Sequence, residues 1–336
     1  MKIWYDITNT PQVHFLLAID KIIKELDSEI HPLYTAREFS ETSKMLTKIL
    51  GEDRFISIGE HRGKSNAKKI VGLVSRFNDI NKLGLDYDVS VSCGSESAVW
   101  ASFLKRKTSI AFGDNDQARQ WTYAPFVSHA FFPRAIPSDI LKKQGLRKKL
   151  YQYDGFKEDI YLSYYQPDST FLETLPFDHY VVVRPENVMA NYIRNGHVES
   201  ITPLLLKELE KKGYNILYLP RYEVDKSYAS GIQSIHIPNQ PINGLDACFF
   251  SEAVLTGAGT FAREAACLGI PSFSFYSGKS LLAVDKELIR QGKMYFSRQV
   301  PELISKLRVS KRTDSDLARC QSVKCEIAGK LREYLF

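Results

Sequence analysis

Residues 253–271 read AVLTGAGTFAREAACLGIP, and this stretch decides the fold of the chain. It begins with a short apolar run typical of a buried strand and then passes through a tight glycine turn. A helix is predicted to open at Thr260 and to stop at Gly269, and a second strand is predicted over Ser272–Tyr276. A strand, a turn, a helix and another strand form the repeating unit of parallel α/β folds.

The turn itself, formed by Gly257, Ala258, Gly259 and Thr260, predicts an anion site. Its small side chains let backbone N–H groups approach a ligand, and the following helix N-terminus carries partial positive charge. Both features suit a phosphate. Glu264 comes one turn later, where a carboxylate can reach a ribose hydroxyl beside the phosphates. The alternative is a joint whose glycines only permit close packing of strand and helix.

Short apolar runs alternate with amphipathic segments along the chain, which predicts parallel α/β architecture. The strands predicted in the first half are Lys2–Ile7, Glu29–Thr35, Arg54–Ile58, Val89–Ser92, Thr108–Phe112 and His129–Phe132. The helices predicted there are Val13–Leu26, Ser40–Leu50, Ala67–Leu83 and Ser97–Leu104. The strands predicted in the second half are His179–Arg184, Asn215–Leu219, Ser234–Ile237, Ala253–Leu255 and Ser272–Tyr276. The helices predicted there are Val198–Lys212, Thr260–Leu268 and Ala283–Gln291.

Each half is large enough for a domain of its own, so residues 1–165 and 166–310 are expected to form two Rossmann-like domains. The segment Tyr151–Pro176 lacks clear periodicity and is interpreted as the linker. Residues 311–336 are expected to form a C-terminal helix that packs back on the first domain. Two such domains would face each other across a central cleft at the carboxyl ends of their strands, where open α/β sheets bind ligands.

Composition narrows the class of protein. The chain has 336 residues and a net charge of +6, without the dense basic and aromatic runs of a nucleic-acid platform. Five cysteines without metal or disulfide spacing fit a reducing cytoplasm. We expect no signal peptide and no membrane span. Three basic clusters, Arg62–Lys69, Lys142–Lys149 and Lys306–Arg312, are compatible with peripheral contact at the inner face of a membrane, although most such clusters are simply solvated.

Polar loops follow the predicted strands of the first half. Thr8 and Asn9 follow the first strand, and His14 lies in the first turn of the next helix. These side chains are candidates to contact a ligand, with His14 as a candidate general base for a hydroxyl. A capping loop with a structural histidine is the alternative.

Two further loops of the first half carry candidate residues. Ser95 follows the fourth strand and is either a ligand donor or a plain helix cap. Asp114 follows the fifth strand and is either a base for a hydroxyl or part of a turn that starts the next helix. Asp116 is spaced to share a cation with Asp114, but this pair belongs to the half opposite the proposed diphosphate turn. We therefore expect no metal site.

In the second half, Arg184 comes directly after a buried apolar strand, where it can clamp a diphosphate or form an inter-domain salt bridge. Asn239 lies in the turn-rich connection 237–246, whose backbone is suited to the edge of a nucleobase. Arg184, the helix N-terminus and the glycine amides are expected to neutralise the phosphates, so no cofactor is required.

Three motifs, in order along essentially the full chain, resemble a known family. They are Asp6–Pro11 with Val13–Phe15, Ile237–Asp246, and Gly257–Thr260 with Arg263–Ala266 and Leu268–Pro271. The family is catalogued as domain of unknown function 354. It is similar to the GT-B superfamily, in which two Rossmann-like domains hold a nucleotide sugar between them. That superfamily includes the N-acetylglucosaminyltransferase that makes lipid II and the non-hydrolysing UDP-GlcNAc 2-epimerases.

The resemblance implies a UDP-type donor held mainly by the second domain. Gly257, Gly259 and Thr260 match the diphosphate turn, and Glu264 matches the ribose-binding acid. The run 184–187, Arg-Pro-Glu-Asn, is similar in part to the Arg-Arg-Glu-Asn run of the epimerases.

In the first half of the chain, the resemblance places His14 near the position at which the lipid II enzyme has a histidine in its first glycine-rich loop. Two positions depart from the pattern. Gln12 stands where the family commonly has His, which weakens any two-histidine mechanism. Ala258 stands where Gly is usual, and backbone binding survives that change.

Three functions follow from these observations. The first is a metal-independent glycosyltransferase with a nucleoside-diphosphate sugar as donor, UDP above all, and a glycan or lipid-linked acceptor. The second is a 2-epimerase, for which Glu96, Asp114, Asp116 and Glu186 could supply carboxylates. The third is a nucleotide-sugar-binding protein without turnover. A homodimer is compatible with all three.

Overall fold

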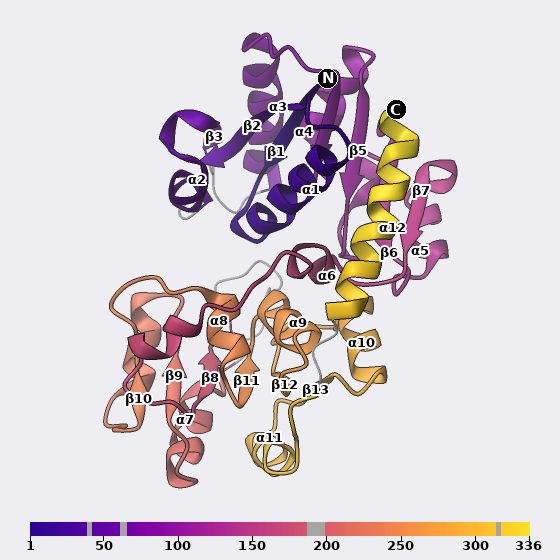
Figure 1. Cartoon of the computed structure of the whole chain (residues 1–336). Helices are drawn as coiled ribbons and strands as arrows, with labels where there is room; N and C mark the ends of the chain where they lie inside the picture. Colours follow the sequence, from indigo (N-terminus) through magenta and orange to yellow (C-terminus); the bar gives the residue numbers. More distant parts are fainter. Residues whose placement is uncertain (39–41, 61–65, 187–198, 314–316) are drawn as a thin grey trace. The chain divides into compact units, whose positions relative to one another are not determined.

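The computed structural model describes residues 1–38, 42–60, 66–186, 199–313 and 317–336. The chain forms two compact units (Figure 1). Unit 1 comprises Met1–Tyr164 together with Ala318–Phe336, and unit 2 comprises Tyr165–Leu317. In the described part of the chain, no helix is both long and apolar enough to cross a membrane.

Unit 1 is built on a parallel sheet of seven strands in the order β3-β2-β1-β4-β5-β6-β7. Its strands are β1 (Lys2–Ile7), β2 (His31–Glu38), β3 (Ile56–Glu60), β4 (Val89–Ser92), β5 (Thr108–Phe112), β6 (His129–Pro133) and β7 (Leu150–Tyr153). The central strands β1 and β4 are buried almost throughout, and even Asp6 in β1 and the two serines of β4 are buried. Their register places Asp6 opposite Ser92 at the carboxyl edge of the sheet.

Helices connect the strands of unit 1. They are α1 (Val13–Leu26), α2 (Thr42–Leu50), α3 (Asn66–Lys82), α4 (Glu96–Leu104), α5 (Ser138–Lys143) and α6 (Lys157–Leu162). The C-terminal helix α12 (Leu317–Leu335), drawn in yellow in Figure 1, runs beside β6 and β7. Its Tyr334 stacks on His129 at 3.7 Å between ring centroids, and its Glu326 accepts a hydrogen bond of 2.7 Å from the Tyr151 hydroxyl.

Unit 2 contains a parallel sheet of six strands in the order β10-β9-β8-β11-β12-β13. Its strands are β8 (Val181–Arg184), β9 (Ile216–Tyr218), β10 (Ile235–His236), β11 (Ala253–Thr256), β12 (Ser272–Ser274) and β13 (Met294–Phe296). Its helices are α7 (Thr202–Lys211), α8 (Gly244–Phe249), α9 (Gly259–Cys267), α10 (Ala283–Arg290) and α11 (Val300–Leu307). The register of β8 on β11 places Arg184 opposite Thr256, again at the carboxyl edge.

The predicted linker Tyr151–Pro176 includes the boundary between the two units, after Tyr164, but it has more secondary structure than expected. It contains the edge strand β7, helix α6 and a short 3-10 helix, Ser169–Thr174. Strand β7 is only four residues long, and α6 is buried although it opens with Lys, Glu and Asp, so neither shows the usual apolar periodicity. Helix α9 begins at Gly259, one residue before the predicted start.

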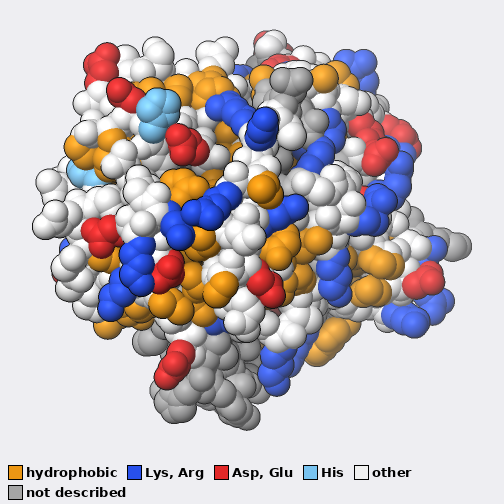
Figure 2. All heavy atoms as spheres, turned by 90° about the horizontal axis from the view of Figure 1, so that it is seen from below, with side chains coloured by type: hydrophobic (Ala, Val, Ile, Leu, Met, Phe, Trp, Pro, Cys, Tyr) orange, Lys and Arg blue, Asp and Glu red, His pale blue; other side chains and the backbone are white. Residues whose placement is uncertain are grey.

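Charge is spread over the surface. On the face shown in Figure 2, Lys and Arg side chains are interspersed with acidic and apolar ones and do not gather into one basic stripe. This agrees with the small net charge of +6.

Candidate functional site

The glycine turn of unit 2 follows β11 and is shaped by close backbone packing. The Gly257 N–H donates to the carbonyl of Arg184 at 3.0 Å, and the Ala258 N–H donates to Oγ1 of Thr256 at 2.9 Å. A Cβ added at Gly257 would lie 2.6 Å from Cα of Glu186. Only glycine fits here, because β11 passes directly against the chain that leaves β8.

The N-terminus of α9 lacks a side-chain cap. The N-cap residue is Ala258, which has no acceptor atom and makes no side-chain hydrogen bond to the helix. The backbone N–H groups of the first helical turn have no partner within the helix itself. Such groups and the helix dipole together form a site for an anion.

Arg263 adds a positive charge under the first turn of α9. Its guanidinium is buried, donates to Asp285 at 3.0 Å and reaches Oγ1 of Thr260 at 3.2 Å. Asp285 balances this charge, so Arg263 holds the turn in shape while Thr260 stays partly exposed at the surface.

Arg184 and Glu264 both interact electrostatically with the same buried thiol, that of Cys248. Burial raises the pKa of Cys248, Glu264 raises it further and Arg184 opposes the rise. The Arg184 guanidinium also lies over the ring of Phe261, 5.4 Å from its centroid. The Arg184 guanidinium at the end of β8 and the half-buried Glu264 carboxylate on α9 therefore both lie within electrostatic range of Cys248.

Glu186, which follows β8, connects the carboxyl edge of the unit 2 sheet to neighbouring segments through its side chain. Its carboxylate accepts hydrogen bonds from Ser200 at 2.6 Å, from Thr202 at 2.8 Å and from Arg298 at 3.2 Å. The side chain is fully buried. These contacts make Glu186 a structural residue, which removes one of the carboxylates considered for epimerisation.

Asn239, the candidate contact to a nucleobase, lies exposed between β10 and α8. The amide that caps α8 is instead Asn243, whose side chain accepts from the Leu245 N–H at 3.0 Å. Asn239 therefore does not cap helix α8. The last residue of the 184–187 run, Asn187, lies outside the described residues.

In unit 1, a buried carboxylate organises the carboxyl edge of the sheet. Asp6 receives two hydrogen bonds from Arg76, at 2.9 and 2.6 Å, one from Ser95 at 2.5 Å and one from Thr35 at 2.6 Å. Burial alone would raise the pKa of Asp6, but Arg76 and the two hydroxyls outweigh it and lower the pKa below its ordinary value. Strands β1 and β2, helix α3 and the N-terminus of α4 are tied together at this point.

A second arginine borders this cluster. Arg37, near the end of β2, has its Nε buried without a hydrogen-bond partner among the described residues. Burial lowers the pKa of Arg37, and the neighbouring Arg76 lowers it further. An unpaired donor in a polar cluster is a group that a bound ligand can satisfy.

The loop after β1 carries the predicted residues Thr8, Asn9 and His14. Gln12 accepts from the Thr8 N–H at 2.9 Å and from its hydroxyl at 3.0 Å, so it fixes the loop. Asn9 is exposed and makes no capping bond. His14 is exposed as well and stacks near Tyr161, with ring centroids 6.4 Å apart. Partial burial lowers the pKa of His14 from the ordinary 6.5, which favours the neutral imidazole.

Two other predicted residues are engaged within the protein. Asp114 forms an ion pair of 2.6 Å with Lys157, whose side chain is only 8% exposed. Ser95 caps α4, accepting from the Ala98 N–H at 3.4 Å while it donates to Asp6. Of the predicted residues in unit 1, His14 is therefore the best placed to accept a proton from a bound ligand.

No group of three or more His, Cys, Asp or Glu among the described residues could hold a metal ion. Residues 61–65, which include part of the basic cluster Arg62–Lys69, lie outside the described residues.

The sequence matches the family described as "Protein of unknown function (DUF354)" over residues 1–324. The chain belongs to the DUF354 family. One DUF354-like relative is "Uncharacterized protein MJ0665" of Methanocaldococcus jannaschii, which is 27% identical over 91% of this chain and 90% of that protein.

The DUF354 chain is also similar to solved structures of low sequence identity. A UDP-GlcNAc 2-epimerase of Methanocaldococcus jannaschii, solved in complex with UDP-GlcNAc and UDP, has a TM-score of 0.66 at 15% identity and covers 93% of this chain and 94% of its own. The glycosyltransferase of kitacinnamycin has a TM-score of 0.59 at 9% identity, with 97% and 90% covered. The chain therefore has a GT-B-like fold of two Rossmann-like α/β domains, and its structural neighbours are enzymes.

Sequence reasoning overlooked the buried cluster in this DUF354 chain. Asp6 interrupts an otherwise apolar strand, which is a signal that a buried charge needs a partner. Its partner Arg76 lies 70 residues away on an amphipathic helix, so the sequence alone could not identify it. The ion pair between Asp114 and Lys157 was overlooked for the same reason.

Proposed function

We propose that this protein is a metal-independent glycosyltransferase that uses a nucleoside-diphosphate sugar, with UDP as the nucleotide. The observation that carries this proposal is the uncapped N-terminus of α9, directly after the glycine turn at Gly257. That arrangement suits a diphosphate, because the free N–H groups and the helix dipole favour negative charge. The structural neighbours solved with UDP or UDP-GlcNAc support the choice of nucleotide.

Residues of both units have roles in the proposed reaction. Arg184 neutralises the diphosphate as it leaves, and the first-turn N–H groups of α9 share that charge. Glu264 accepts hydrogen bonds from the ribose. His14 takes the proton from the acceptor hydroxyl, because its lowered pKa keeps the imidazole neutral near pH 7.

The acceptor in this proposal is a glycan or a lipid-linked sugar with a free hydroxyl. We place the reaction in the cytoplasm, since the spacing of the five cysteines in the sequence suggests no disulfide framework.

A thermal-shift screen tests the nucleotide. UDP or a UDP-sugar is expected to raise the melting temperature of the wild type, because a ligand that binds only the folded state stabilises it. The same ligand is expected to give little shift with Arg184→Ala or Glu264→Ala. If no nucleotide shifts the wild-type protein, the proposal fails.

A second candidate is 2-epimerisation of UDP-GlcNAc. It is favoured by the name of the structural neighbour solved with UDP-GlcNAc and UDP. Incubation with UDP-GlcNAc separates the candidates: an epimerase turns it over without an acceptor, whereas a transferase releases UDP only when an acceptor is present. Tight binding without either product would indicate a binding protein.

A further inference from the structure

Unit 1 exposes a group of large apolar side chains near the amino-terminal edge of its sheet. Phe103 and Leu104 end α4, and Trp121 and Phe126 lie on the segment that leads to β6. The exposed fraction is 52% for Phe103, 64% for Leu104 and 59% for Trp121. Single exposed apolar residues are common on soluble proteins, but a contiguous group marks an interaction surface.

Contacts hold these side chains on one surface. The rings of Phe103 and Phe126 meet edge to face, 5.0 Å between centroids. The indole N–H of Trp100, one turn before Phe103, donates to the carbonyl of Thr122 at 3.0 Å. Trp121 adjoins that carbonyl in the chain, so the segment 120–126 lies along α4.

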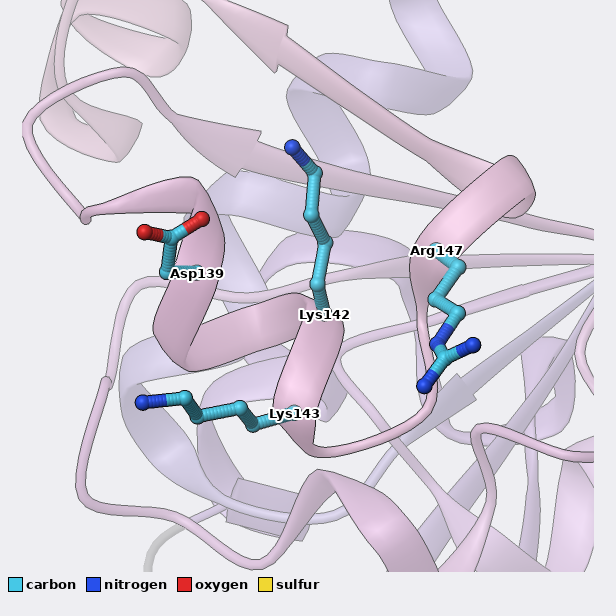
Figure 3. Close-up of a pocket in the computed structure, with 4 residues that line it drawn as sticks. All are labelled: Asp139, Lys142, Lys143 and Arg147. Atoms are coloured by element: carbon cyan, nitrogen blue, oxygen red, sulfur yellow. The ribbon is translucent and has the colours of Figure 1, made fainter.

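A strongly basic segment is attached to the same surface. The Gln120 N–H donates to the Gln144 side chain at 2.7 Å, and Lys149 donates to the carbonyl of Pro125 at 2.8 Å. Residues 141–149 carry five Lys or Arg and no acidic residue. Figure 3 shows Lys142 and Lys143 extending from α5 and Arg147 extending from the turn that follows.

The charge on the neighbouring segments has the same sign. Residues 103–107 carry three cations and residues 117–126 carry one, again without a carboxylate. Arg106 has a φ of 55°. Asp139, Lys142, Lys143 and Arg147 line one pocket, and Asp139 is the acidic residue among these four. Glu96 lies at the other end of α4, hydrogen-bonded to Thr122 at 3.2 Å.

We propose that unit 1 docks on an anionic phospholipid bilayer through this apolar–basic surface, defined by Phe103, Leu104, Trp121 and Phe126 with Lys142, Lys143 and Arg147. The aromatic and leucine side chains enter the interfacial region, while the cations contact lipid phosphates. Membrane-surface proteins combine these two features, because neither a few apolar side chains nor a few cations alone gives stable binding.

The basic cluster of unit 2, Lys306–Arg312, does not offer this combination, because Val309 is the one exposed large apolar side chain in this described stretch. In unit 2, Arg312 lies over the Phe249 ring and donates to its backbone carbonyl at 2.8 Å, and Lys306 lies over Tyr295. The cluster Arg62–Lys69 falls on residues whose side chains are not described.

Sedimentation of the full chain with vesicles tests this proposal. The protein is expected to bind vesicles that mix phosphatidylglycerol with phosphatidylcholine, to stay in solution with phosphatidylcholine alone, and to be released by high salt. Trp121 serves as a built-in probe, because its fluorescence is expected to shift to shorter wavelength when it enters the interface.

Matched variants separate the two parts of the surface. The double variant Phe103→Ser/Trp121→Ser is expected to bind vesicles at least about tenfold more weakly, whereas Val309→Ser, an equally exposed apolar position in unit 2, leaves binding unchanged. Lys142→Gln/Lys143→Gln is expected to lose about thirtyfold, at about 1 kcal/mol per cation near the surface. Lys207→Gln/Lys212→Gln removes the same charge from unit 2 and is the control.

Three results would overturn the proposal. One is equal binding to both kinds of vesicle, and another is full binding by both double variants. The third is a wild type that ignores vesicles and self-associates through Phe103 and Trp121, measured by light scattering, because the surface would then belong to a second copy of the chain. None of these measurements depends on nucleotide binding, so the outcome is independent of the proposed enzymatic function.

Discussion

At the scale of single residues, the carboxyl edge of unit 1 depends on one buried charge. Asp6 is fully inaccessible to solvent and is paired with Arg76. The pair is costly to bury, but breaking it is costlier, because one charge then remains without a partner. The same residue therefore fixes both the local fold and the loop that presents His14.

Asp6→Asn is expected to lower the free energy of unfolding by about 3 kcal/mol, since it leaves Arg76 unpaired. The pKa of Asp6 is lowered in the folded state, so its contribution is complete above pH 3.8 and is lost as the pH falls through the folded pKa. Urea unfolding at neutral and acid pH measures this: the gap between wild type and variant narrows below pH 3.8.

The control for that variant is Asp86→Asn, because the Asp86 carboxylate is 79% exposed and pairs only with the surface residue Lys2. Its unfolding curve should match the wild type. Equal stability of Asp6→Asn and Asp86→Asn would show that the buried pair does not hold the sheet edge.

His14→Gln tests the proposed base. We expect kcat to fall by about 10²- to 10⁴-fold, with little change in the affinity for nucleotide. The pKa of His14 lies below 6.5, so wild-type activity should fall as the pH drops through that pKa and protonates the imidazole. The variant should lack this acidic limb in a pH–rate profile. A variant with unchanged kcat would exclude His14 as the base.

At the scale of elements, the sequence predicted most of the architecture. The bounds of β1, β4, β5 and α1 agree with the prediction, because these elements have clear apolar runs or a clear helical period. The elements that were not predicted are β7, β13, α5, α6, α8 and α11, which have between three and eight residues. Elements this short contain too few positions for a period to stand out.

The glycine turn is the element on which binding depends. Gly257→Ala is expected to lose about 1–3 kcal/mol of stability, because the new carbon would collide with the backbone of Glu186. Gly259→Ala should cost less, since its new carbon meets only the flexible end of Arg263, at 3.2 Å. Melting curves of the two variants make the comparison. Equal tolerance at both positions would contradict the packing described for this turn.

At the scale of the whole molecule, the fold is better defined than the reaction. A GT-B-like fold is shared at 9–15% identity with enzymes named as epimerases and as a glycosyltransferase. One fold supports several reactions, so the site must decide between them. The sequence located the strand-end loops that carry the site. The sequence could not show which carboxylates form ion pairs within the protein. The pair between Asp114 and Lys157, for example, joins residues that are far apart in the chain.

The central claim is that the N-terminus of α9 holds the diphosphate of UDP, and calorimetric titration of UDP into Thr260→Asp tests it most directly. An acidic residue in the first helical turn stabilises a helix, so this variant should fold as well as the wild type. Its carboxylate would repel a diphosphate, and UDP binding should be lost. Leu204→Asp, which adds the same charge to the exposed first turn of α7, should bind UDP like the wild type. If Thr260→Asp binds UDP with wild-type affinity, the diphosphate does not lie at α9 and the account is wrong.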